Sequence, residues 1–431
     1  MKHRWAAKTR WAALTVAAMA AVVIASPADA QTPAAGNGAD HTVAFNRTLG
    51  PGWFDAVIAL PDGGFALAGR EFETVGPGQA RTRGALVVRL DRKGAVVWRK
   101  SFGSPAAPRW AMSITALPDG HFDVAGTAHV DTKTLEWWAE LDGDGKLIKD
   151  VMTSGDGRST SKLREIVRQI VRLSDRRHAV IDDDSLESGK KDWQLVIVNR
   201  DGSDALHLKL PDKSLDCFGM LAGVRDGGLV VTWQDVKEDK ANGPRIRRYD
   251  ARGDIVYERA FGAYPNACAN DIQVLDDGGY LLTGALMDAK EQPAWTARLD
   301  AQGSLLWEQR YGAAGSQILS YAVTGAANGV AVAGGCMQDG PTNHDSDLHA
   351  FVSVFDAQGR QLWNKIVHAG QNGSMVRALA LLPDGGLVLA GSRNIGCLEL
   401  SGHLTGGEAL VFTIPPDQMP PAATRAGDTR Q

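Results

Sequence analysis

The stretch LPDGGFALAG at residues 60–69 decides the fold, because versions of it recur along the whole chain. Two apolar runs with the period of β-strands flank an Asp-Gly-Gly turn. The turn residues are spaced by 57, 56, 51, 51, 51 and 56 residues, which indicates an array of similar units. The other copies are LSDRRHAVID (173–182, degenerate), LPDGHFDVAG (117–126), RDGGLVVTW (225–233), DDGGYLLTG (276–284), AANGVAVAG (326–334) and LPDGGLVLAG (382–391).

A second hairpin follows in each repeat and is built on a D-x-x-G turn, as in ALVVRLDRKGAVVWRKSFG at 85–103. In this turn Asp accepts local backbone N–H bonds and Gly supplies the positive φ. In four repeats an aromatic residue stands four positions after the Gly, and we predict it to pack between neighbouring repeats. These aromatic residues are Trp98, Tyr257, Trp307 and Trp363.

Two antiparallel hairpins per repeat predict a four-stranded sheet, and seven such sheets predict an all-β, seven-bladed β-propeller over residues 42–417. The last repeat supplies a third strand in EALVFTIPPD (408–417) but no fourth. At the other end, TVAFNRTLG (42–50) has the fourth-strand pattern without a hairpin of its own. We therefore expect the N-terminal strand to complete the last blade and cover its open edge.

The N-terminus has the pattern of a signal peptide at residues 1–30. Basic residues precede a 14-residue, largely apolar run at 12–25, too short for the roughly 20 residues of a membrane span, and Ala28-Asp29-Ala30 offers a cleavage site. The expected location is periplasmic or secreted. Residues 31–41 are predicted to be a flexible segment, and residues 418–431 a disordered tail.

Charge excludes one class of function. The chain has 46 basic and 50 acidic residues, and removing four basic and one acidic residue with the signal leaves 42 and 49, a net charge near −7. Nucleic-acid binding needs a positive field, so this class is excluded, and stable membrane insertion is not expected. A monomer is expected.

The repeat, with DGG before an aromatic and then D-x-x-G-x-x-x-W, resembles secreted bacterial β-propeller repeat proteins over about residues 42–417. Its second hairpin is also similar to the tryptophan-docking motif of quinoprotein-type propellers. Quinoprotein dehydrogenases of that type carry a vicinal cysteine pair, and this chain has no Cys-Cys dipeptide. No cofactor is therefore expected.

The four cysteines fall at related positions of the repeats. Cys217 and Cys268 each lie nine residues before a turn Asp, so they start adjacent innermost strands, and we predict a disulfide between them in an oxidising compartment. Cys336 and Cys397 follow the second strands of repeats 6 and 7 and form a second candidate pair. The alternative of a zinc site lacks any C-x-x-C spacing.

Candidate ligand-binding residues lie seven positions before each turn residue, where the innermost strands approach the central channel. This ring could hold a small anionic or sugar-like ligand, or be a water-filled plug. The candidates are Asp55, Arg168, Asn270, Tyr321 and Arg377, and Met112 and Gly219 complete the ring.

Catalytic and metal motifs are sparse. No G-x-S-x-G, H-E-x-x-H or P-loop motif occurs, so no catalytic residue is assigned, although paired carboxylates from different repeats stay open. Two acidic stretches offer cation ligands, but such stretches are usually solvated loops, so no metal is assigned. They are the loop containing His344, Asp345, Asp347 and His349, and the run of Asp182, Asp183 and Asp184.

These features favour an exported, non-catalytic binding or scaffold module that recognises a protein, peptide or glycan on its loop-bearing face. One alternative is a propeller hydrolase or lyase with its site at the channel mouth. The other is a purely structural envelope protein.

Overall fold

The computed structural model describes most of the repeat region. The described residues are 45–76, 79–131, 133–153, 158–159, 170–183, 193–210, 220–237, 240–287, 292–312, 317–325, 331–338, 348–367, 373–393 and 407–419. Within these ranges the only helix is the short 3₁₀ helix η2 (Pro416–Gln418), and none has the length and apolar character of a membrane span.

The strands follow one another along the chain almost without other structure. In order they are β1 (Phe45–Ala59), β2 (Phe65–Gly76), β3 (Gln79–Leu90), β4 (Val96–Ser104), β5 (Ala107–Ala116), β6 (Phe122–Val130), β7 (Lys133–Leu141), β8 (Leu147–Met152), β9 (Arg158–Ser159), β10 (Ile170–Arg172), β11 (His178–Asp183), β12 (Trp193–Val198), β13 (Asp204–Lys209), β14 (Met220–Gly223), β15 (Leu229–Lys237), β16 (Lys240–Tyr249), β17 (Ile255–Ala260), β18 (Ala267–Val274), β19 (Tyr280–Leu286), β20 (Ala294–Leu299), β21 (Leu305–Tyr311), β22 (Gln317–Gly325), β23 (Ala331–Gln338), β24 (Leu348–Phe355), β25 (Gln361–Val367), β26 (Ser374–Leu381), β27 (Leu387–Arg393) and β28 (Glu408–Ile414).

These strands form five hydrogen-bonded sheets, all with antiparallel neighbours. Four are four-stranded and correspond to repeats 3 to 6: β10 to β13, β14 to β17, β18 to β21 and β22 to β25. The fifth sheet has twelve strands and runs β26-β27-β28-β1-β2-β3-β4-β5-β6-β7-β8, with β9 paired to β7. The sequence predicted separate four-stranded sheets here, and two continuities explain the difference.

The first continuity is β1 itself, which pairs with a different strand along each of its two halves. Its first part pairs with β28, from Phe45↔Thr413 to Pro51↔Glu408, and its second part pairs with β2. The predicted pairing of the N-terminal strand with the last repeat is thus present, but as part of one continuous strand. Gly52, at φ +145°, permits the change of partner, because a Cβ there would lie 2.2 Å from the Arg70 carbonyl oxygen. The second continuity is the short β4–β5 contact, with Gly103↔Pro108 and Ser104↔Ala107.

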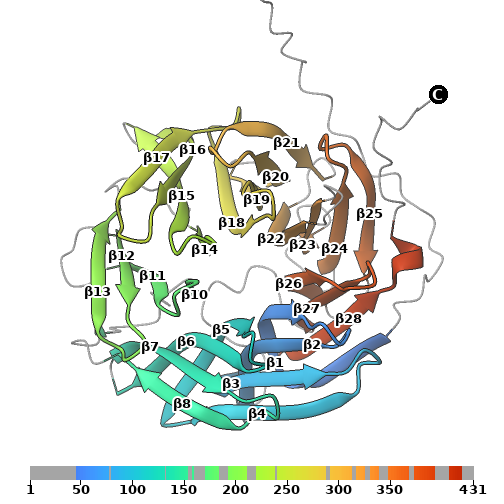
Figure 1. The fold of residues 1–431 in the computed structure, drawn as a ribbon. Helices are drawn as coiled ribbons and strands as arrows, with labels where there is room; N and C mark the ends of the chain where they lie inside the picture. Colours follow the sequence, from blue (N-terminus) through green and yellow to red (C-terminus); the bar gives the residue numbers. More distant parts are fainter. Residues whose placement is uncertain are drawn as a thin grey trace, which may run out of the picture.

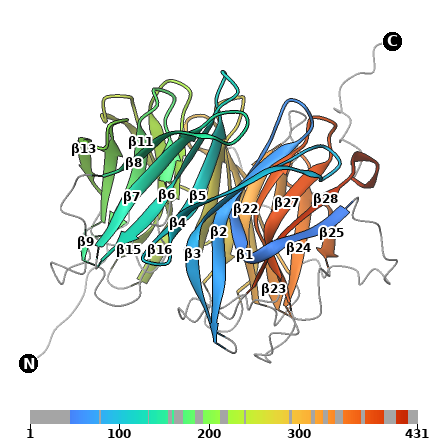
Figure 2. The ribbon, with the colours of Figure 1, turned by 90° about the horizontal axis from the view of Figure 1, so that it is seen from below.

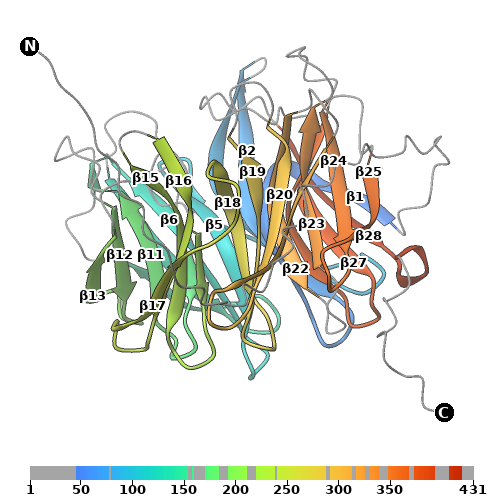
Figure 3. The same cartoon turned by 90° about the horizontal axis from the view of Figure 1, so that it is seen from above.

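The sheets stand around a common centre, with the first strand of each repeat innermost (Figure 1), which is the arrangement of a β-propeller. Because each repeat is an antiparallel meander, its D-G-G and D-x-x-G turns lie at one end of the sheet. The ends of the second strands and the starts of the third strands lie at the other end (Figures 2 and 3). We call these two ends the turn face and the loop face.

The core is formed where neighbouring repeats pack, and the predicted aromatic residues lie in these contacts. Trp98 is buried, donates from Nε1 to the Gly143 carbonyl at 2.9 Å and contacts Phe122 edge-on. Each of three aromatic residues covers a glycine of the next D-x-x-G turn, where a Cβ would lie 2.6–2.8 Å from the ring. The pairs are Trp98 on Gly145, Tyr257 on Gly303 and Trp307 on Gly359. The packing prediction is confirmed for these three, and Trp363 also packs, partly buried, against the core of the last repeats.

We expect Gly145→Ala to lower the free energy of unfolding by about 3 kcal/mol, measured by urea denaturation, because the new methyl group overlaps the Trp98 ring. The matched control is Gly120→Ala in the same repeat. Gly120 also has a positive φ, of +83°, but nothing lies within 4 Å of its Cβ position, so only the backbone cost of about 1 kcal/mol applies. Equal losses in the two variants would contradict the docking role.

Candidate functional site

The predicted ring residues are the bulged residues of the innermost strands. In five of these strands the register with the second strand skips one residue, and each time it is the ring residue. A β-bulge leaves its extra residue outside the ladder and re-aims its side chain. The five residues are Asp55, Met112, Asn270, Tyr321 and Arg377. Arg168 and Gly219 lie outside the described residues.

Glycines on the second strands explain why the bulges form at these places. A Cβ on the facing glycine would lie only 1.8–2.0 Å from the carbonyl oxygen two residues before the ring residue. No side chain fits there, so the Gly that ends the repeat motif is a packing requirement. The four glycines that show this contact are Gly69, Gly126, Gly284 and Gly391.

Asp55 joins three innermost strands. Its Oδ1 accepts a hydrogen bond from Arg377 Nε of β26 at 2.7 Å. Its Oδ2 accepts from Trp53 Nε1 at 2.8 Å and from Trp110 Nε1 of β5 at 2.5 Å. Only 8% of the Asp55 side chain is exposed. The carboxylate is therefore occupied by three donors and holds the first, second and last repeats together at the axis.

Two guanidinium groups lie on the aromatic rings of this cluster. Arg70 Cζ is 3.0 Å from the ring centroid of Trp110 and 4.2 Å from that of Trp53. Arg377 Cζ is 5.2 Å from Trp53 and 5.7 Å from Tyr321. These are cation–π distances, which favour the charged form of a partly desolvated arginine. The cluster presents cations and aromatic faces rather than a free nucleophile.

The structure thus brings Asp55, Tyr321 and Arg377 together, whereas Asn270 contacts a different neighbour. Asn270 Nδ2 donates to the Ser320 carbonyl of β22 at 3.0 Å. Beside it, the Asp271 carboxylate accepts from the backbone N–H groups of Ile272 and Val323, each at 2.9 Å. Burial raises the pKa of Asp271 to about 6.

Three members of the cluster were missed by the sequence reasoning: Trp53, Trp110 and Arg70. A signal for the two tryptophans was present, because both lie nine residues before a turn Asp, the same register that identified Cys217 and Cys268. No comparable pattern marked Arg70.

The cysteine and cation predictions fall largely on residues outside the described ranges. Cys268 on β18 is buried and disulfide-bonded. Its predicted partner Cys217 lies outside the described residues, as does Cys397, and only the backbone of Cys336 is described. Both pairings stay predictions. His344, Asp345, Asp347 and Asp184 are likewise outside, and Asp182 and Asp183 are described only as backbone of β11.

We expect Asp55→Ala to lower the free energy of unfolding by about 3 kcal/mol, since it leaves the partly buried Arg377 guanidinium and two indole N–H groups without their acceptor. Thermal or urea denaturation measures the loss. Asp276→Ala is the control, because its ion pair with Arg225 is exposed at both ends and contributes at most about 0.5 kcal/mol. A loss no larger than that of the control would contradict the role of Asp55.

The raised pKa of Asp271 predicts a pH dependence of stability. From about pH 4 to pH 6 the unfolded chain releases the proton while the folded chain retains it, so stability falls by roughly 3 kcal/mol and is level above pH 6. Asp271→Asn removes this titration. The unfolding free energy of wild type minus that of Asp271→Asn should therefore decrease across this window, and a constant difference would contradict the assignment.

Comparisons with known proteins give a fold likeness only. No family model and no curated protein matches the chain. Among solved structures, the C-terminal WD40 domain of Sif2 has a TM-score of 0.46 at 9% identity, covering 86% of this chain and 99% of that one. Chaetomium thermophilum Sqt1 bound to the N-terminus of ribosomal protein L10 has a TM-score of 0.48 at 12% identity, covering 86% and 100%. Penicillium chrysogenum α-L-arabinanase complexed with arabinobiose has a TM-score of 0.41 at 12% identity, covering 87% and 100%. At these values the likenesses say nothing about what this chain binds.

Proposed function

We propose that this chain is an exported binding or scaffold module, a seven-bladed propeller that acts as a monomer and recognises a protein or peptide on its loop face. The observation that carries the proposal is the series of bulges at the loop-face ends of the innermost strands. Five strands repeat the same backbone irregularity, and each presents a different side chain there: Asp, Met, Asn, Tyr and Arg.

A constant frame with variable side chains is suited to recognition. Side chains held on strands keep their geometry better than side chains on loops, so a partner meets a preformed surface. Of the five described ring residues one is a carboxylate, and its oxygens already accept from three donors. This arrangement supports binding over acid–base chemistry at these five positions.

Two further parts of the proposal have independent support. The seven-blade division is supported by the strand pairings, which run in groups of four when β1 is counted with both β28 and β2. Export is supported by the signal pattern at residues 1–30 and by the disulfide of Cys268, since disulfides persist in oxidising compartments.

The test is capture of partners from periplasmic extract or culture medium on immobilised chain, followed by titration with each purified candidate. We expect Arg377→Ala and Asn270→Ala each to raise the Kd about tenfold or more, because both alter side chains at bulged positions. The control is Asp144→Ala, an exposed residue in a turn of the turn face, which should leave the Kd unchanged.

The thermal midpoint of each variant is measured first, so that loss of binding is not confused with loss of folding. A partner whose affinity responds to Asp144 but not to the ring residues would contradict the loop-face proposal. Capture of no partner together with turnover of a glycan or lactone panel would overturn it in favour of the channel-mouth enzyme.

A further inference from the structure

In repeats 1, 4 and 5 the turn face carries the same ion pair, and repeat 2 has a different group of side chains at this place. In repeat 1 the turn residue Asp62 accepts from the Gly64 backbone N–H at 2.9 Å and from Arg89 Nη2 of β3 at 2.8 Å. The Gly64 N–H and the Arg89 guanidinium hold the pKa of Asp62 below its ordinary value. Repeats 4 and 5 have the same arrangement. Their pairs are Asp226 with Arg248, and Asp277 with Arg298.

The second glycine of the turn is closely packed in repeats 4 and 5. In repeats 4 and 5 a Cβ on that glycine would lie 2.2 Å from the arginine Nη1, because the guanidinium lies directly over it. A side chain at this position would meet the guanidinium and also the backbone carbonyl oxygen of Tyr249 or Leu299, at 2.2 and 2.5 Å. The glycines are Gly228 and Gly279.

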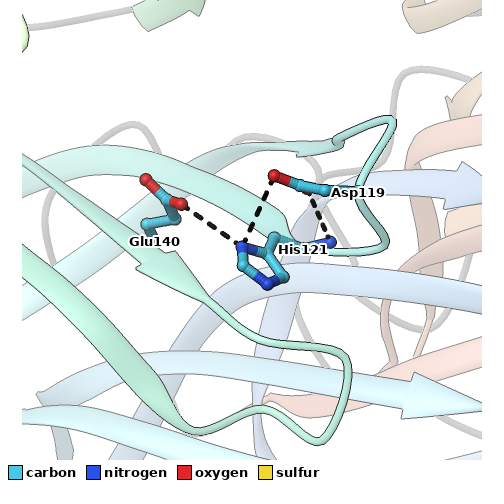
Figure 4. A group of neighbouring side chains, drawn as sticks. All are labelled: Asp119, His121 and Glu140. Atoms are coloured by element: carbon cyan, nitrogen blue, oxygen red, sulfur yellow. Dashed lines mark hydrogen bonds and ion pairs between the residues drawn. The ribbon is translucent and has the colours of Figure 1, made fainter.

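Repeat 2 differs both at the position of the second glycine and at the position of the arginine. His121 stands in place of the second glycine, and Glu140 of β7 stands in place of the arginine. Two carboxylates, of Asp119 and Glu140, now face the slot that holds a cationic group in the other three repeats. His121 Nδ1 lies between them, 3.3 Å from Glu140 Oε1 and 3.7 Å from Asp119 Oδ2 (Figure 4).

We propose that Asp119, His121 and Glu140 form a site for a divalent transition-metal ion, with Zn²⁺ as the reference ion. Their three ligand atoms lie within 4.8 Å of one another. Zinc takes His nitrogen and carboxylate oxygen at about 2.0–2.1 Å, so ligand atoms of a tetrahedral site stand about 3.3 Å apart. The two separations from His121 Nδ1, 3.3 Å and 3.7 Å, are close to this value, and water would complete the fourth position.

The surroundings suit an accessible site of moderate affinity. The second Glu140 oxygen pairs with Arg200 from the neighbouring repeat, which leaves Oε1 toward His121. Asp119 and His121 are partly exposed, so an ion can reach them from solvent. The positive charge of Arg200 opposes a cation, while an imidazole ligand favours a transition metal over Ca²⁺ or Mg²⁺. We therefore expect a dissociation constant in the micromolar range.

The test is calorimetric titration of ZnCl₂ into the full chain near neutral pH, after chelator treatment and dialysis, with Co²⁺ absorption as a second readout of coordination. Wild type should bind one ion at this site, and His121→Ala should weaken the binding about tenfold or more. The double variant His121→Gly/Glu140→Arg recreates the turn of repeats 1, 4 and 5. It also replaces the Glu140–Arg200 ion pair by two like charges, so its thermal midpoint is first compared with that of wild type without the ion. It should lose both the binding and the stabilisation by Zn²⁺.

His207→Ala is the matched control, because His207 forms an exposed pair with Asp204 elsewhere on the propeller and should not affect the titration. Equal Zn²⁺ affinity in wild type and the double variant would overturn the proposal. So would the absence of binding in wild type. This site lies on the turn face, so its failure leaves the loop-face proposal untouched.

Discussion

The contact between an outer-strand side chain and the turn glycine of the next repeat is the interaction on which the rest of the structure depends. A single four-stranded sheet leaves both of its faces open, and only stacking on its neighbours buries them. Trp98, Tyr257 and Trp307 make this contact with an aromatic ring. In repeat 3 Leu206 takes the place, lying 2.3 Å from a Cβ position on Gly253. In repeat 2 Lys149 stands at this position and donates from Nζ to the Arg200 carbonyl at 2.8 Å, while the turn glycine Gly202 lies against Met152 and Val151.

Where the aromatic side chain of the outer strand is missing, polar side chains contribute to the contact between the two repeats. Between repeats 2 and 3, His178 Nε2 lies 2.9 Å from Asp123 Oδ1 and the imidazole stacks on Trp138 at 5.0 Å between centroids. His178 is fully buried, so a hydrogen-bonded pair replaces part of the apolar contact made elsewhere. Repeat 2 thus departs from the common pattern at its outer strand, at its turn and at its contact with repeat 3. Such local departures from a repeat are where specific chemistry is expected.

The architecture could be predicted from the sequence, but only part of the candidate site could. Repeat spacing located the strands, the turns and the residue at which five of the innermost strands bulge, because these follow from a periodic backbone. It did not place Arg70 on the two tryptophans or Arg377 on Asp55, since these contacts join residues that are distant in the chain, up to 322 positions apart. The Asp119, His121 and Glu140 cluster was also missed. Aligning the second hairpins would have found it, because Glu140 stands where Arg89, Arg248 and Arg298 stand.

The two-partner strand β1 has a consequence for the order of assembly. Its first half pairs with β28, so the earliest described strand to be synthesised must wait for the last one. Contacts of such high sequence separation slow folding, because a very long loop has to close before the ladder contributes any stability. A nascent or C-terminally truncated chain would hold Phe45–Pro51 as an unpaired edge next to an otherwise formed hairpin. The first half of β1 can therefore pair only after the chain has been synthesised through residue 414.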